Sequence, residues 1–207
     1  MLLVDRNVVR DVLTATLGDR AHDGRRFVGY LPRADGRYDV HFVDGSQLIA
    51  DVVVGADGAD STVRKLRFPG WKAEPLTTFP FTGRLPMSAY TLLPRELIVD
   101  DTIIVGAAGT MLVLAPLRVR EGGAQAFAKT VTSRPAPHDT MSWHLTLPRT
   151  NFPDADAVTT LRGRALHQLV RAQVTAFAPE LRAIIDGSDP DGVVLGATHF
   201  TSTLPDW

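Results

Sequence analysis

Cysteine is missing from this sequence of 207 residues. Its absence excludes disulfide bridges, thiolate metal sites, a catalytic cysteine and cofactor attachment through a cysteine sulfur. A long hydrophobic run is missing too, because no stretch reaches the ~18 apolar residues of a membrane-spanning helix. The opening segment, MLLVDRNVV, lacks the basic start of a signal peptide and is interrupted by charged residues. These absences predict a cytoplasmic protein with no membrane partner.

An excess of charge of one sign is also absent. With 22 basic and 23 acidic residues the formal net charge is −1, which argues against an electrostatic grip on nucleic acid. The densest basic cluster comprises Arg64, Lys65 and Arg67, and its composition is more typical of a solvated helix end than of a phosphate site. The six histidines show no metal-ligand spacing, so we predict no metal site.

The first third of the chain mixes helical and strand patterns. Apolar residues at helical spacing predict an amphipathic helix over 7–17. Alternating side chains bounded by Asp-Gly turns predict two antiparallel strands, 26–31 and 38–43. A run of three valines over 51–55 predicts a strand that is buried on both faces of a layered α/β domain. Ser61 is placed to cap a helix that follows this strand.

The rest of the chain is strand-rich and then helical. Breaks around Pro69-Gly70 place a boundary near residue 70. A long helix is expected over 157–177, a shorter one from Pro179 to Gly187, and a last strand from Val193. The candidate strands between these limits are 76–85, 102–107, 110–119, 125–133 and 140–147.

The segment DVVVGADGADSTVR, residues 51–64, carries the chemistry that the sequence suggests. A glycine-bearing turn at Gly58 lets backbone approach a ligand closely, and Asp57 can accept hydrogen bonds from ribose or ribityl hydroxyls. The helix capped by Ser61 would suit a diphosphate, and Arg64 adds a positive charge one turn later. An ordinary capped turn is the bland alternative. A calcium loop is disfavoured because the alternating acids and the distal glutamate are missing.

This segment resembles the Asp-Gly motif of class A flavoprotein monooxygenases, which have the para-hydroxybenzoate hydroxylase fold. The earlier stretch VDRNVVRDVL is similar to the family's Arg-x-x-Leu segment, with Arg6 in the flavin-contacting position and Val9 in the leucine position. The resemblance covers residues 4–67 well and rests on architecture beyond residue 70. The final residues, 204–207, resemble the stretch that leads into the family's Gly-Asp motif.

The resemblance implies a mixed α/β (α+β) fold with part of an FAD-binding Rossmann-like domain and a β-sheet substrate domain. It assigns residues 1–70 to the FAD-binding part, 71–152 to the substrate domain, and 153–207 to a helix and strand that return to the flavin domain. The implied cofactor is FAD, with NAD(P)H as co-substrate. The implied FAD-binding residues are Arg6, Asp57, Gly58, Ser61 and Arg64.

The implied reaction is hydroxylation or epoxidation of a small organic molecule, aromatic or polyketide-like, with O₂. No side chain is expected to act as a catalytic acid, base or nucleophile. On the predicted strand 140–147, Trp143 and His144 are candidate substrate contacts, although core packing is the favoured interpretation. Arg84 is a further pocket candidate that no motif supports.

Two motifs of the family do not occur in these residues: the Gly-x-Gly-x-x-Gly turn that cradles the FAD pyrophosphate, and Gly-Asp. We therefore expect the chain to be the middle of a longer monooxygenase. Alone it should bind FAD weakly or not at all, and should be inactive. Two alternatives remain open: a flavin reductase, halogenase or oxidase of the same fold, and a truncated paralogue without catalysis.

Overall fold

The computed structural model describes residues 5–95, 102–107, 109–131 and 137–200. The predicted motif-like ending at 204–207 therefore lies outside the described residues. Contacts divide the chain into two compact units. The larger unit comprises residues 1–17 and 76–198, and the smaller unit comprises residues 18–75 and 199–207. No helix in the described ranges is long and apolar enough to cross a membrane.

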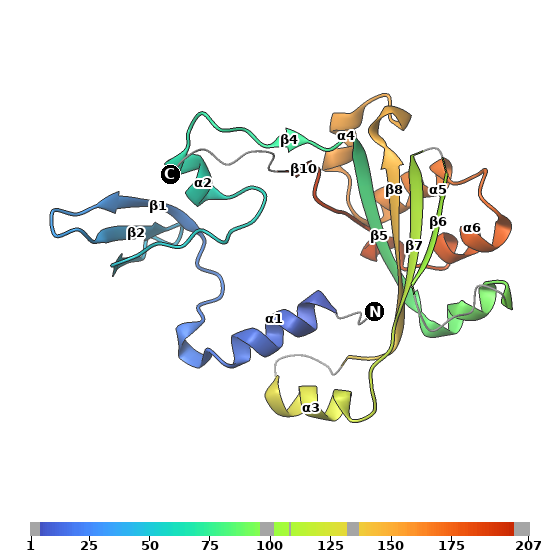
Figure 1. The fold of residues 1–207 in the computed structure, drawn as a ribbon, viewed down its shortest axis with the longest axis horizontal. Helices are drawn as coiled ribbons and strands as arrows, with labels where there is room; N and C mark the ends of the chain where they lie inside the picture. The colour runs from blue at the N-terminus through green and yellow to red at the C-terminus, as the bar shows by residue number, and fades with distance from the viewer. Residues whose placement is uncertain (1–4, 96–101, 108, 132–136, 201–207) are drawn as a thin grey trace. The chain divides into compact units, whose positions relative to one another are not determined.

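The larger unit is built on an antiparallel sheet of five strands in the order β6-β7-β8-β5-β9 (Figure 1). Four predicted strands are confirmed, and the expected strand near Val193 is the short β9. The central pair, β5 and β8, is in register from Thr78 opposite Pro148 to Pro86 opposite Thr140. The strand bounds are β5 Thr78–Pro86, β6 Ile103–Ala107, β7 Thr110–Leu117, β8 Thr140–Pro148 and β9 Val194–Leu195.

Helices cover one face of this sheet and form the core with it (Figure 1). Every second side chain of β5 and β8 is buried, as expected of a sheet with one covered face. Burying each large apolar side chain contributes about 1.5–3 kcal/mol. The largest fully buried side chains are Phe79, Phe81, Leu112, Leu114, Met141, Trp143, Leu145 and Leu147 from the strands, with Leu166, Val170, Ile184 and Ile185 from the helices.

The core helices are α4 Ala155–Thr160, α5 Gly163–Gln173 and α6 Pro179–Asp186. The short helix opened by Pro179 is confirmed, but the single helix predicted over 157–177 is wrong. The chain is extended at Arg162, and Gly163 then has a φ of +48°. A Cβ on Gly163 would lie 3.0 Å from a backbone oxygen of Asp191, so the break depends on glycine.

The strand predicted over 125–133 is also wrong, because this region forms helix α3, Gly123–Thr130. Alanines alternate with other residues in AQAFAK and so imitate the period of a strand. Alanine, glutamine and lysine are strong helix formers, and only Phe127 of this helix is buried. Local propensity therefore decides the structure.

Helix α1, Arg6–Ala15, matches the helix predicted over 7–17, but its buried face differs from the prediction. Asp5 caps the helix by accepting hydrogen bonds from the backbone N–H groups of Asn7 and Val8. Asp11 is the buried residue, whereas Leu13 is exposed. Helix α1 lies beside α3 in the same unit (Figure 1). Short 3₁₀ segments occupy Gly18–Arg20, Met87–Leu92, Arg149–Asn151 and Pro190–Gly192.

The observed units differ from the three-part division predicted from the sequence. Residues 1–17 group with the sheet of the larger unit rather than with the Asp-Gly motif. The helices of 153–198 pack on the same core as strands β5 to β8, because their apolar faces complete the buried side of that sheet. Residues 76–198 thus form one body with their helices.

The smaller unit contains a three-stranded antiparallel meander. The two strands predicted around the Asp-Gly turns are confirmed, and the third strand, Gln47–Ala50, was not predicted. Gly36 and Gly45 have the positive φ values, +81° and +80°, that these turns require. A helix and a two-stranded ribbon complete the unit. The bounds are β1 Phe27–Pro32, β2 Tyr38–Phe42, β3 Gln47–Ala50, α2 Thr62–Arg67, β4 Glu74–Pro75 and β10 His199–Phe200.

The buried strand predicted over 51–55 is not formed. Val52 to Gly55 have no strand assignment and no paired strand among the described residues, and the side chains of Val52 and Val54 are 73% and 81% exposed. A strand of a layered α/β sheet needs paired neighbours on its edges, and the described chain supplies none here.

Candidate functional site

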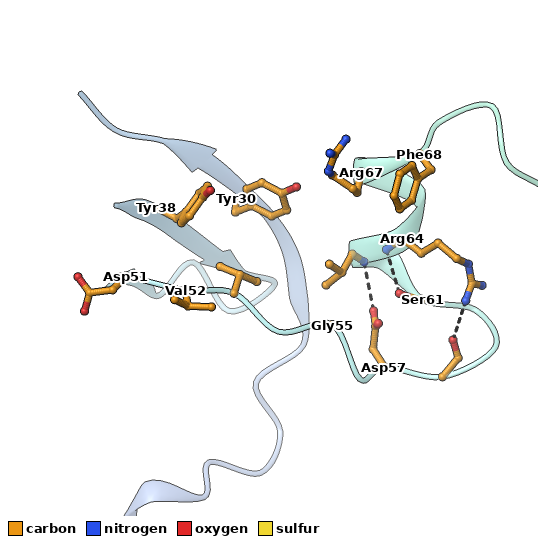
Figure 2. A pocket seen from close by; sticks show the side chains of 13 residues that line it. Tyr30, Tyr38, Asp51, Val52, Gly55, Asp57, Ser61, Arg64, Arg67 and Phe68 are labelled. Atoms are coloured by element: carbon orange, nitrogen blue, oxygen red, sulfur yellow. Dashed lines mark hydrogen bonds between the residues drawn. The ribbon is translucent and has the colours of Figure 1, made fainter. Parts of the chain in front are cut away.

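The turn after Val54 brings the predicted motif residues of the smaller unit together at the start of α2 (Figure 2). Gly55 packs against the helix so closely that a Cβ would lie 2.8 Å from Cβ of Val63. Gly58 has a φ of +82°, and a Cβ there would meet nothing within 4 Å. The first glycine therefore serves packing, and the second gives a left-handed turn whose backbone faces open space.

Asp57 ties this turn to the helix. Its Oδ2 atom accepts hydrogen bonds from the backbone N–H groups of Thr62 at 2.6 Å and Val63 at 3.3 Å. Partial desolvation raises the pKa of Asp57, but hydrogen bonds from the Ser61 hydroxyl and from these two N–H groups outweigh it, so the pKa lies below its ordinary value. Asp57 is therefore an ionised capping group.

Ser61 is the helix cap that the sequence predicted. Its buried side chain accepts a hydrogen bond from the backbone N–H of Arg64 at 2.9 Å. Together, Asp57 and Ser61 occupy the first three N–H groups of α2. The sequence predicted that this helix start would suit a diphosphate. In the structure these three N–H groups are not free for a ligand, because the chain already satisfies them.

Arg64 folds back over the turn (Figure 2). Its Nη1 donates to the carbonyl of Gly58 at 3.2 Å, and its Nη2 donates to the carbonyl of Ala59. The guanidinium also lies over the ring of Trp71, 4.4 Å from the centroid, in a cation–π contact. Its buried Nε has no hydrogen-bond partner among the residues that the structure describes. Arg64 thus fixes the turn and keeps one donor unused.

A cavity of about 580 Å³ opens beside the turn (Figure 2). Two aromatic rings from the meander, Tyr30 and Tyr38, line it and meet edge to face with centroids 5.5 Å apart. Phe68 and Arg67 line it from the end of α2. The walls combine flat apolar rings with hydrogen-bonding and cationic groups, which is the composition of sites for organic ligands.

Arg6 belongs to the larger unit, whereas Asp57 belongs to the smaller one. It is exposed at the start of α1 and borders a second cavity of about 190 Å³ on the uncovered face of the sheet. This cavity also contains His144, the histidine that the sequence singled out, and Arg84. Its described lining is Asp5, Arg6, Thr82, Arg84, Ala115, Leu117, Thr140, Ser142 and His144.

Trp143 lies on the opposite side of the sheet from His144. Its side chain is fully buried in the core, which confirms the favoured interpretation of this residue. Thr82 and Ser142 were not identified from the sequence. The sequence pattern that could have identified them is the alternation of the strands. Residues that alternate with buried ones lie together on the opposite face of the sheet. Among the described residues, no group of three His, Asp or Glu side chains could hold a metal ion.

Known proteins related to this chain are monooxygenases. A segment of 61 residues is 43% identical to the FAD-dependent monooxygenase pytG of Aspergillus terreus, covering 30% of this chain and 18% of that protein. A segment of 73 residues is 41% identical to rifampicin monooxygenase of Streptomyces venezuelae, covering 35% and 15%. No family profile matches the chain.

The fold agrees with these sequence relationships. A crystal structure of a protein assigned as an FAD-containing monooxygenase from Photorhabdus luminescens superposes with a TM-score of 0.75 and 22% identity. The match covers 96% of this chain and 52% of that one, so the chain corresponds to about half of the solved protein. The mixed α/β fold and the resemblance to FAD-dependent monooxygenases are thereby confirmed.

Proposed function

We propose that this chain is the flavin-contacting and substrate-facing part of an FAD-dependent monooxygenase that uses NAD(P)H and O₂ to hydroxylate or epoxidise a small organic molecule. The turn from Asp57 to Arg64 is the observation that carries this proposal. It combines the sequence of the family's Asp-Gly motif with an ordered, open backbone at Gly58. The relatives pytG and rifampicin monooxygenase supply the reaction class.

The residues present fit FAD in part. Gly58 offers a backbone that a ligand can approach closely. Asp57 uses Oδ2 for the helix, and its carboxylate has further lone pairs that could accept a hydrogen bond from a hydroxyl of the cofactor. Arg64 has a buried Nε that finds no partner within the described part of the chain, and a cofactor oxygen would satisfy it. The start of α2 contributes structure rather than free N–H groups, so phosphate binding falls to other parts of the protein.

In this proposal the two units have different tasks. The smaller unit holds FAD through Asp57, Gly58, Ser61 and Arg64. Arg6 of the larger unit is proposed as an FAD contact on the sequence resemblance alone. The uncovered face of the larger unit's sheet orients the substrate and keeps water away from it. FAD, when bound, would carry electrons from NAD(P)H to O₂ and so supply the oxygen-transfer chemistry. The side chains bind and orient, and none is assigned as an acid or base.

Titration of the purified chain with FAD, followed by quenching of flavin fluorescence, tests the cofactor assignment. We expect weak but saturable binding, because the Gly-x-Gly-x-x-Gly turn that grips a dinucleotide pyrophosphate does not occur in these residues. Asp57→Ala should weaken binding several-fold, and the neighbouring exposed Asp60→Ala should not. Emission that stays unquenched at millimolar protein would remove the cofactor assignment.

The reaction class needs a separate measurement. Since the folds superpose, a chimaera can carry these residues in place of the matching half of the Photorhabdus protein. We expect NAD(P)H and O₂ to be consumed together, with oxygen from ¹⁸O₂ recovered in the organic product. Consumption that yields only hydrogen peroxide in the presence of every organic substrate tried would favour the oxidase alternative. A folded, flavin-loaded chimaera without turnover would favour the non-catalytic alternative.

A further inference from the structure

The uncovered face of the large sheet carries a cluster of polar side chains that line one cavity. Thr82 of β5 lies directly opposite His144 of β8, and Arg84 lies opposite Ser142. These four side chains alternate with the buried core residues, so they share the face that the core helices leave open. Ala115 and Leu117 of β7 provide the apolar part of the same cavity.

His144 is anchored through one ring nitrogen, and its surroundings favour the neutral imidazole. Its Nδ1 lies 3.1 Å from Oγ1 of Thr82, the only hydrogen bond of this ring within the described ranges. Burial lowers the pKa of His144, and the positive charge of Arg84 lowers it further. A neutral imidazole has one donor and one acceptor nitrogen. With Nδ1 engaged by Thr82, Nε2 is left for a ligand in either tautomer.

Arg84 forms an ion pair with a carboxylate of the same unit. Its Nη2 lies 2.8 Å from Oδ2 of Asp5, whose side chain is only 10% exposed. The other oxygen of Asp5 caps α1, so the carboxylate is fixed on both sides. The positive charge of Arg84 is thereby balanced within the cavity. Arg6 also borders the cavity, but in the proposed function its positive charge contacts FAD and not the substrate.

The size of the cavity limits the ligand. A protein cavity of about 150 Å³ can hold benzene. The present cavity of about 190 Å³ is open to solvent, so the part of a ligand that enters it is about one substituted ring. We propose that Thr82 and His144 form the recognition pair for an oxygen atom of a neutral, single-ring organic molecule, and that this pair selects neutral hydroxyl or carbonyl compounds over carboxylates. That this molecule is the substrate rests on the proposed function.

Binding of two probes of similar size to the full chain tests this proposal. Phenol can donate and accept one hydrogen bond, whereas benzoate carries a negative charge. In ¹⁵N spectra of histidine-labelled protein without FAD, phenol should shift the Nε2 signal of His144 in a saturable way. Benzoate should bind at least several-fold more weakly. His144→Ala should abolish the saturable phenol effect on neighbouring backbone signals, and the exposed control His22→Gln should leave it unchanged.

A second variant separates recognition from folding. Thr82→Val keeps the branched shape of the side chain and removes the hydroxyl, so the imidazole loses its anchor. Phenol affinity should fall by about 2- to 10-fold, the usual effect of one lost hydrogen bond. Phenol affinity that is unchanged in both variants overturns the proposal, and so does tighter binding of benzoate that disappears in Arg84→Gln. The phenol binding test contains no FAD. If the flavin titration fails, the phenol result therefore still holds, and only the identification of the ligand as the substrate is lost.

Discussion

Removal of the Asp57 carboxylate gives a prediction that can be worked through quantitatively. Asp57 accepts hydrogen bonds from the N–H groups of Thr62 and Val63 at 2.6 and 3.3 Å. Replacing a side chain that caps a helix start by alanine costs about 0.5–2 kcal/mol. The opening of α2 should therefore become about 2- to 30-fold more frequent in Asp57→Ala.

Amide hydrogen exchange measures this opening directly, because the affected N–H groups are the reporters. The protection factors of Thr62 and Val63 should fall by that amount in Asp57→Ala and by less in Asp57→Asn, which keeps an acceptor oxygen. Asp60 lies in the same turn, is exposed and makes no hydrogen bond through its side chain among the described residues, so Asp60→Ala is the matched control. Equal protection in Asp57→Ala and wild type would refute the capping role.

The pH dependence of this protection has a definite sign. Hydrogen bonds hold the pKa of Asp57 below its ordinary value in the folded chain. Its contribution to stability is therefore complete above the unfolded pKa of about 3.9 and is lost as the pH falls through the lower folded pKa. The measurement compares the protection of Thr62 and Val63 in wild type and in Asp57→Ala at pH 6 and at pH 2. A difference between the two proteins that is equally large at both pH values would contradict this sign.

Three further predictions concern other parts of the molecule. Gly83→Ala would place a Cβ 2.4 Å from the ring of Trp143, so the Tm should fall by an amount equivalent to about 1–3 kcal/mol; an unchanged Tm would show that the core yields there. Arg64→Lys removes the guanidinium that donates to two carbonyls and stacks on Trp71. The fluorescence of Trp71 should therefore change, and an identical spectrum would argue against the contact. The lowered pKa of His144 means that the folded state binds fewer protons than the unfolded state. Its presence should therefore make the free energy of unfolding fall as the pH drops below about 6.5, and His144→Gln should flatten that slope in urea titrations.

The antiparallel sheet and the meander were largely predictable from the sequence. Alternation places Phe79, Phe81 and Leu85 on one face of β5, and the Asp-Gly pairs place the turns around β2. Where the pattern failed, a local preference conflicted with it. The alanines of α3 imitate a strand, and one glycine, Gly163, divides a helix that periodicity alone would continue.

The site was predictable in its residues but not in its contacts. The motif pointed to Asp57, Ser61 and Arg64, and the structure places all three in one turn. Sequence reasoning assigned their polar groups to a ligand, whereas most of those groups satisfy the turn itself. A motif cannot distinguish these uses, because a carboxylate placed to reach a ribityl hydroxyl is also placed to cap the next helix.

The residues on the uncovered face of the sheet could not be grouped from the sequence. Thr82 and Arg84 of β5 are far in the sequence from Ser142 and His144 of β8, and no motif links the two pairs, so only the strand register brings them together. Similarly, the three valines of 51–55 predicted a buried strand from composition alone. Whether such a run is buried depends on which neighbours pair with it, and the described chain contains no such neighbour.

Mapping of FAD contacts on the ¹⁵N-labelled chain tests the central claim most directly. If the turn is a flavin-contacting element, titration with FAD should shift the backbone amide signals from Gly58 to Arg64 and that of Arg6. The signals of exposed loops such as Asp35-Gly36 should stay fixed. Shifts that are absent from this turn, or spread evenly over the surface, would contradict the assignment of these residues to a flavin site.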